Sequence, residues 1–229
     1  MKKYFSLCLL TLFAYGQDYN FISGSTIINS NIGESHSTKT KVVKDKIIPK
    51  EDFNQITVNG AFHLTIKHGL ENSFIIETNK EFIKNIAFNI KNSNLDIKMV
   101  KNIINPTKLN ITINAKLLDT LKVNGASTIT VNNFIKDDFK LFVDGASTVI
   151  FNNGVFNNFF INSYGSYEIN LLKSKIKNAN IDADGSGTIK LNVTDYLKVK
   201  LDGTVDIKYH GHPKIKKDMK SIVPSLEAI

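Results

Sequence analysis

The chain of 229 residues carries a formal net charge of +8, and each of its basic residues is a lysine. Arginine side chains, whose forks recognise phosphates and base edges, are absent, so the composition disfavours nucleic acid as a partner. The one cysteine, Cys8, lies in an apolar N-terminal stretch. Removal of that stretch leaves no thiol for a disulfide, a thiolate metal site or a covalent nucleophile.

Residues 1–16 have the pattern of a signal peptide. Two lysines precede a short apolar stretch, and Ala14-Tyr15-Gly16 places small residues at the two positions that a signal peptidase reads. The stretch is too short to span a bilayer, and the sequence offers no other transmembrane candidate. We expect cleavage before Gln17 and a mature protein that is periplasmic, attached to the outer-membrane surface or secreted.

Residues 17–50 are polar and predict an irregular lead-in that caps the domain starting at residue 51. From there, apolar and polar residues alternate between Gly and Asn turn signals, as expected of short strands. The NSN of FNIKNSNLDIK indicates a hairpin-like turn, and residues 79–86 are the single helical candidate. The strand runs are ITVNGAFHLTIKHG, SFIIET, AFNIKNSNLDIKM and KLNITINAK.

A repeat of twenty residues follows, and its last unit is shorter by two. It is marked by five glycines, which we expect at the bends between strands because glycine accepts a positive φ. A fixed short period is typical of a solenoid, in which each unit buries its apolar side only against its neighbours. The glycines are Gly125, Gly145, Gly165, Gly185 and Gly203.

Apolar residues recur once per unit in four columns, two of which lie two residues apart, the period of a strand face. These columns predict an all-β fold, a right-handed parallel β-helix-like solenoid with coils of roughly twenty residues over 51–213. More irregular strands are expected in its N-terminal half, and residues 214–229 are expected to form a tail or cap. The columns are Leu121, Leu141, Ile161, Ile181 and Leu201; Ile129, Val149, Ile169, Ile189 and Ile207; Val131, Phe151, Leu171, Leu191 and Tyr209; and Phe139, Phe159, Ala179 and Val199.

The segments DFNQITVNGAFHLTIKHG, SNLDIK, the repeated GAST, GSYEIN and GSGT, and the closing DIKYHGHPKI resemble the bacterial head-GIN domain family of auto-transporter adhesins. The resemblance covers residues 43–213, although this chain has Gly-Ala-Ser twice where the family usually has Gly-Ser-Gly. It implies a β-helix-like fold, an envelope or exported location and a role in adhesion, and it carries over no catalytic residue.

Two groups of side chains are candidates for a metal site. Asp144, Asp184 and Asp202 recur just before the glycines and could bind a cation, but Asp-Gly is a common turn pair and Tyr164 interrupts the column. The histidines of YHGHP supply half of a zinc site, with no Cys or acidic pair nearby to complete it. We therefore expect no metal, no cofactor and no enzymatic activity.

The sequence favours an exported, non-enzymatic protein that presents one face of its solenoid to a glycan or another envelope component. An end-to-end structural scaffold is the alternative, because unpaired strand edges are templates for association, and a carbohydrate-active enzyme is a third reading. The oligomeric state is left open. The expected contact residues, outward-facing on one strand layer, are Thr128, Thr130, Thr148, Asn170, Lys190 and Lys208.

Overall fold

The computed structural model describes residues 25–28, 42–220 and 224–229, and the predicted signal peptide lies outside these residues. The fold is all-β, a single curled, open sheet of fifteen strands with one short 3₁₀ helix, η1 (Lys80–Asn85). η1 occupies the segment predicted as helical. The strands are β1 (Ser25–Ile28), β2 (Val42–Pro49), β3 (Gln55–Gly60), β4 (His63–His68), β5 (Ser73–Asn79), β6 (Ile86–Lys91), β7 (Asn94–Met99), β8 (Leu109–Ala115), β9 (Thr120–Gly125), β10 (Thr128–Asn132), β11 (Ile135–Ala183), β12 (Ser186–Leu201), β13 (Thr204–His210), β14 (Lys214–Met219) and β15 (Ser225–Ala228).

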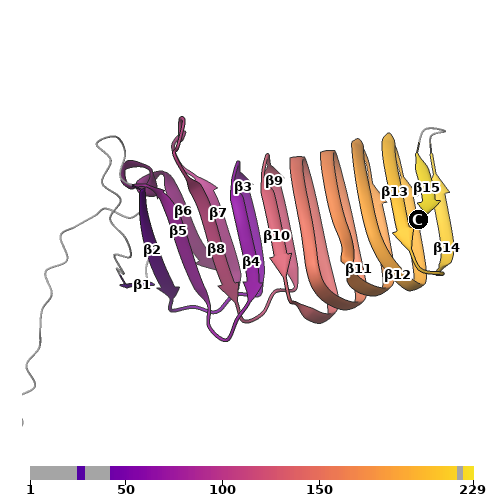
Figure 1. The fold of residues 1–229 in the computed structure, drawn as a ribbon, viewed down its shortest axis with the longest axis horizontal. Coiled ribbons are helices and arrows are strands. Elements are labelled where there is room, and N and C mark those ends of the chain that lie inside the picture. The colour runs from indigo at the N-terminus through magenta and orange to yellow at the C-terminus, as the bar shows by residue number, and fades with distance from the viewer. Residues whose placement is uncertain (1–24, 29–41, 221–223) are drawn as a thin grey trace, which may run out of the picture.

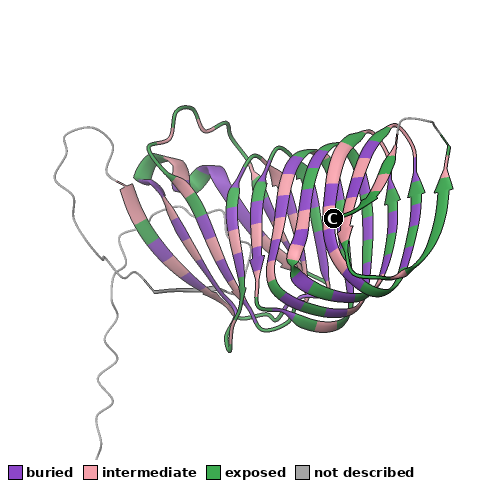
Figure 2. Ribbon diagram, turned by 45° about the vertical axis from the view of Figure 1, so that its right-hand side comes forward, coloured by how far each residue is buried: buried purple, intermediate pink, exposed green. Residues whose placement is uncertain are grey.

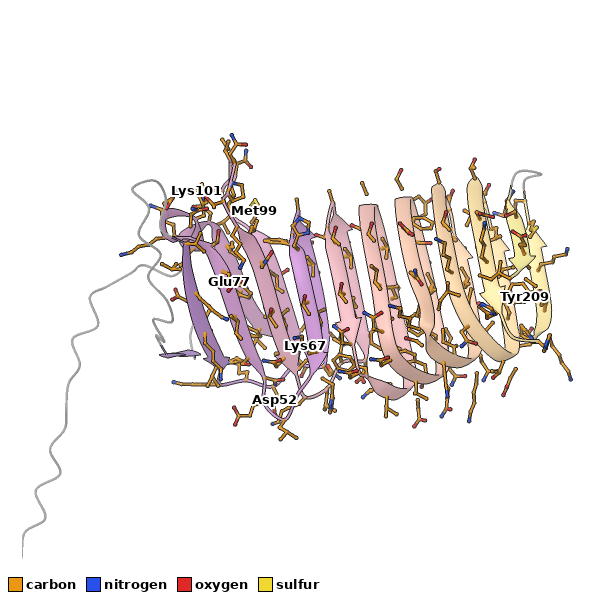
Figure 3. The ribbon with its side chains drawn as sticks, in the orientation of Figure 1. Asp52, Lys67, Glu77, Met99, Lys101 and Tyr209 are labelled. Atoms are coloured by element: carbon orange, nitrogen blue, oxygen red, sulfur yellow. The ribbon has the colours of Figure 1, made fainter. Side chains whose placement is uncertain are left out.

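The N-terminal end of the sheet is antiparallel. β2 pairs with β5, β5 pairs with β8, and β6 and β7 form the predicted hairpin through Asn92 and Ser93, which both have positive φ. Glu77 of β5, which is labelled in Figure 3, forms ion pairs with Lys108 at 2.7 Å and with Lys44 at 3.7 Å. These pairs connect three segments of this end of the sheet. The hydrogen bond from Lys108 lowers the pKa of Glu77.

Strands β1 and β2 lie inside the range predicted to be an irregular lead-in. β2 is a strand of eight residues whose Ile47 is fully buried in the core. The C-terminal residues likewise extend the sheet, since β14 pairs with β12 and β15 pairs with β13. Both ends of the chain therefore contribute strands to the sheet.

The rest of the sheet is parallel and repeats with a period of twenty residues. Leu121 pairs with Leu141, Ile129 with Val149 and Ile169 with Ile189. The long strands β11 and β12 pass from one side of the curl to the other, so the sheet has two layers (Figure 1). We call them the β10 layer, with β4, β10, β13 and the parts of β11 and β12 that pair with them, and the β9 layer, with β3, β9, β14 and the corresponding other parts.

The core fills the space between the two layers, and buried residues alternate with exposed or half-buried ones along β9, β10 and most of β11 and β12 (Figure 2). Every member of the four predicted columns is buried except Tyr209, which packs partly buried against the core. Phe139 stacks on Phe159 with their ring centroids 5.2 Å apart, and Phe151 and Phe156 meet both rings edge-on. The stack of coils is thus held by a continuous apolar interior.

The predicted corner glycines all have positive φ, and they lie directly upon one another. A Cβ on Gly125 would lie 2.6 Å from the carbonyl oxygen of Gly60, and one on Gly165 would lie 2.8 Å from that of Gly145. Glycine is therefore required at each corner for two reasons: the positive φ, and the close approach of the neighbouring coil.

Gly125→Ala tests this double requirement. The φ of +120° and the contact with Gly60 are both unfavourable for a side chain, so we expect the free energy of unfolding to fall by roughly 2–4 kcal/mol. Urea denaturation followed by circular dichroism measures the change. Ala126→Ser, at the next, exposed position, is the matched control and should leave stability unchanged. Equal stability of the two variants would contradict the packing described for the corner.

Candidate functional site

The six residues predicted to make contacts all lie on the outer surface of the β10 layer. Thr128 pairs with Thr148, and Asn170, Lys190 and Lys208 follow one another in register. Thr128 is exposed and the other five residues are half-buried between their neighbours. The twenty-residue register therefore gathers these residues into two adjacent columns, as the sequence predicts.

The two lysines of this face have acidic neighbours. Lys190 lies 3.4 Å from Glu168, and Lys208 lies 3.9 Å from both Asp206 and Glu227. Exposed pairs of this kind contribute little to stability, about 0–1 kcal/mol each. Their effect is to neutralise the C-terminal part of the face, so that threonine hydroxyls and amides characterise it more than net charge does.

Three aromatic side chains lie on the opposite, β9 layer, and sequence reasoning did not identify them as a group. Phe142 and Phe160 are each 37% exposed, and Tyr164 is 60% exposed. The Lys122 ammonium lies 5.7 Å from the centre of the Phe142 ring. The repeat itself could have revealed them, since each ring stands in a column whose other members are polar residues.

Beside Tyr164 the surface forms a hollow with a volume of about 220 Å³. Its walls come from four successive strand segments, with Asn162 and Tyr164 on the first, Asp182 and Asp184 on the second, Lys200 and Asp202 on the third and Lys220 on the fourth. Lys200 donates a hydrogen bond to Asp182 at 2.8 Å, while Lys220 lies 4.0 Å from Asp202. The hollow therefore has charged side chains next to an exposed ring.

Three carboxylates lie around the exposed Tyr164 hydroxyl. The interaction with Asp184 raises the pKa of Tyr164, and the negative charges of Asp202 and Asp144 act in the same direction. The Tyr164 ring therefore stands in an acidic environment on the β9 layer.

The inner side of the same coil departs from its neighbours. In the two preceding coils this corner position is serine, and the Ser127 and Ser147 hydroxyls each donate to the carbonyl of a glycine one coil away. The coil that carries Tyr164, the third of the repeat, has the buried Tyr167 at this position instead. The Tyr167 ring fills the space that a Cβ of Gly187 would occupy. Burial raises the pKa of the Tyr167 hydroxyl, which faces Ser163.

Smaller residues compensate for the bulk of Tyr167. The facing column is Val123, Val143, Ser163 and Ala183, so its side chains become smaller beside the Tyr167 ring. Tyr167 and Gly187 pair directly in the ladder. The large residue and its small neighbours therefore form one packing unit beneath the exposed Tyr164.

The remaining candidate groups do not assemble into a chemical site. In the described part of the chain, no three His, Cys, Asp or Glu side chains gather as a metal ion would require. His210 and His212 are both exposed, on either side of Gly211. No helix within the described ranges is long and apolar enough to cross a membrane.

The packing of Tyr167 against Gly187 predicts strong coupling between the two positions. Gly187→Ala should lower the free energy of unfolding by about 1–3 kcal/mol, because its Cβ would overlap the ring. Tyr167→Ser removes that overlap and restores the serine of the earlier coils. We expect the double variant to be more stable than the sum of the single effects by at least about 1 kcal/mol, measured by urea denaturation. Additive effects would show that the two side chains do not compete for space.

Comparison with known proteins gives a consistent picture. The family model described as "Putative auto-transporter adhesin, head GIN domain" matches residues 52–153 and 139–213. Among curated proteins, no sequence matches the chain.

Several solved structures have a similar fold. A "putative adhesin" from Bacteroides fragilis has a TM-score of 0.68 at 18% identity, over 84% of this chain and 98% of that one. A "putative adhesin" from Parabacteroides distasonis has a TM-score of 0.51 at 16% identity, over 83% and 97%. A "putative lipid binding protein" from the same organism has a TM-score of 0.50 at 17% identity, over 91% and 99%. At these identities the likeness establishes the all-β fold.

Proposed function

Because the chain belongs to the head GIN domain family, we propose that it is an exported, non-enzymatic, adhesin-like module that binds a glycan or another cell-envelope component. The leader at residues 1–16 would direct it to the periplasm, the outer-membrane surface or the medium. The family supports the adhesive role, and the leader pattern supports export.

The observation that carries the proposal is the regular outer surface of the β10 layer. Successive coils present hydroxyl, amide and ammonium groups in two columns at the spacing of parallel strands, about 4.8 Å. An extended ligand that crosses the coils would meet threonine hydroxyls first and then the Asn170 amide and the Lys190 and Lys208 ammonium groups. We assign the contact role to Thr128, Thr130, Thr148, Asn170, Lys190 and Lys208.

We further propose that the two layers close into a right-handed parallel β-helix-like solenoid. The twenty-residue register and the stacked corner glycines support this winding. A right-handed connection between parallel strands of one sheet is also the strongly preferred one. Such a rigid scaffold would hold the contact columns at fixed spacing without the ligand having to order them.

The alternative role, an end-to-end scaffold, is disfavoured by the C-terminal edge. β14 is a highly charged strand with Lys214, Lys216 and Lys217 all exposed. Lysines on an edge strand oppose pairing with another copy. We therefore propose that the protein acts through its faces and not through its ends.

Thr148→Lys and Lys190→Glu test the assigned face. The first puts a long charged side chain in the middle of a column, and the second breaks the Lys190–Glu168 pair and sets two acids side by side. We expect each to weaken retention of the mature protein on cell-envelope fractions about tenfold.

Lys198→Glu is the matched control, because it makes the same charge change on the β9 layer of the same coil and its side chain is exposed. It should bind as the wild type does. Unchanged binding of both Thr148→Lys and Lys190→Glu would remove the contact role from this face.

A further inference from the structure

We propose that the β9 layer carries a second binding site, in which an uncharged glycan stacks a sugar ring on Tyr164, flanked by Phe142 and Phe160. This inference rests on the proposed function for the class of ligand, a glycan. It assigns a surface that neither the repeat nor the family resemblance singled out.

The register brings the three rings together. Phe160 and Tyr164 are on the same strand segment and point to the same side, since they are separated by an even number of residues. Phe142 lies one coil earlier, where the twenty-residue offset sets it opposite Asn162, midway between the other two. Diagonal neighbours at this spacing are within reach of aromatic side chains. One continuous outer patch therefore holds three rings around one amide.

The stacking of coils does not require these rings. The equivalent positions in adjacent coils are Lys122 and Asn162 for Phe142, Lys140 and Asn180 for Phe160, and Asp144 and Asp184 for Tyr164. All six of these are polar residues suited to a solvated face or a turn. Three neighbouring aromatic replacements, all exposed, form an apolar patch of the kind that marks an interaction site.

The charges of the hollow beside Tyr164 favour an uncharged ligand. Asp182 and Asp202 have lysine partners, Lys200 and Lys220, whereas Asp184 adds a third carboxylate, so the lining of the hollow has one more negative than positive charge. An anionic group is therefore disfavoured in the hollow, while Lys122 lies beside Phe142 on the other side of the Tyr164 coil. The carboxylate and amide oxygens of the hollow are instead hydrogen-bond acceptors for sugar hydroxyls, and the rings offer flat surfaces for the C–H face of a pyranose.

Binding at this site should cost little side-chain conformational entropy. Tyr164 has only two side-chain torsions, so ordering its ring against a sugar costs little conformational entropy. The strands beneath it are packed through Tyr167 and Gly187 on the inner side. An aromatic side chain so placed contributes contact area at a low cost in conformational entropy.

Affinity electrophoresis of the mature protein tests the site, with laminarin, mannan and dextran as uncharged polysaccharides and alginate as the anionic one. We expect retardation by at least one uncharged polysaccharide and none by alginate. Tyr164→Ala and the double variant Phe142→Ala/Phe160→Ala should each weaken that binding about tenfold or more. Tyr164→Phe keeps the ring and should stay within about threefold of the wild type.

Two controls separate the site from the fold and from the other face. The midpoint of thermal unfolding should be nearly unchanged in Tyr164→Ala, Tyr164→Phe and Phe142→Ala/Phe160→Ala, because the rings are exposed. If the double alanine variant unfolds at a lower temperature, Phe142→Leu/Phe160→Leu takes its place. Thr148→Lys on the β10 layer should bind the uncharged polysaccharide as the wild type does.

The outcomes distinguish this site from the proposed function. Binding that survives both Tyr164→Ala and the double ring variant, or that is lost only in Thr148→Lys, overturns the β9-layer site and leaves a glycan-binding role intact. Retardation by alginate alone overturns it too. If no polysaccharide retards the wild type, the site is refuted, and retention on envelope fractions then decides the adhesin-like role separately.

Discussion

The close vertical contact between corner glycines sets the geometry of the sheet. Each corner backbone lies against the corner of the coil before it, from Gly60 through Gly125 and on to Gly203. A side chain at any of these positions would separate two coils, and the separation would be transmitted to the ladders on both layers. The parallel register, the alternation of buried and exposed residues and the spacing of the outer columns all depend on this contact.

With the corners fixed, a replacement in one coil has to be accommodated by the next coil. Tyr167 illustrates this, because its ring takes space that only a glycine at 187 and smaller residues at 163 and 183 leave free. The third coil thus departs from the repeat on both sides, with a large ring inside and Phe160 and Tyr164 outside. Its inner packing supports the strand segment from which the outer rings project.

The parts of this architecture that repeat could be predicted from sequence, and the parts that do not repeat could not. The corner glycines and the columns headed by Leu121, Ile129 and Val131 occur at equal spacing, so their burial and register follow from period alone. β2 was missed because its partners, such as Thr78 and Glu77 of β5, are distant in sequence and its own residues are mixed in polarity. The aromatic patch was missed because its members belong to two coils and three columns, and only the register unites them.

The two halves of the sheet differ in how far apart in sequence their partners are. From Thr120 onward each strand pairs with residues about twenty positions away, and loop closure over that distance is comparatively inexpensive in entropy. By contrast, Gln55 pairs with Thr120 and His63 pairs with Thr128, in each case across sixty-five residues of sequence. Local pairings form faster than distant ones. Apart from the local β6–β7 hairpin, folding should therefore begin in the C-terminal coils and spread backwards, so most of the part of the chain synthesised first is the last to acquire its structure.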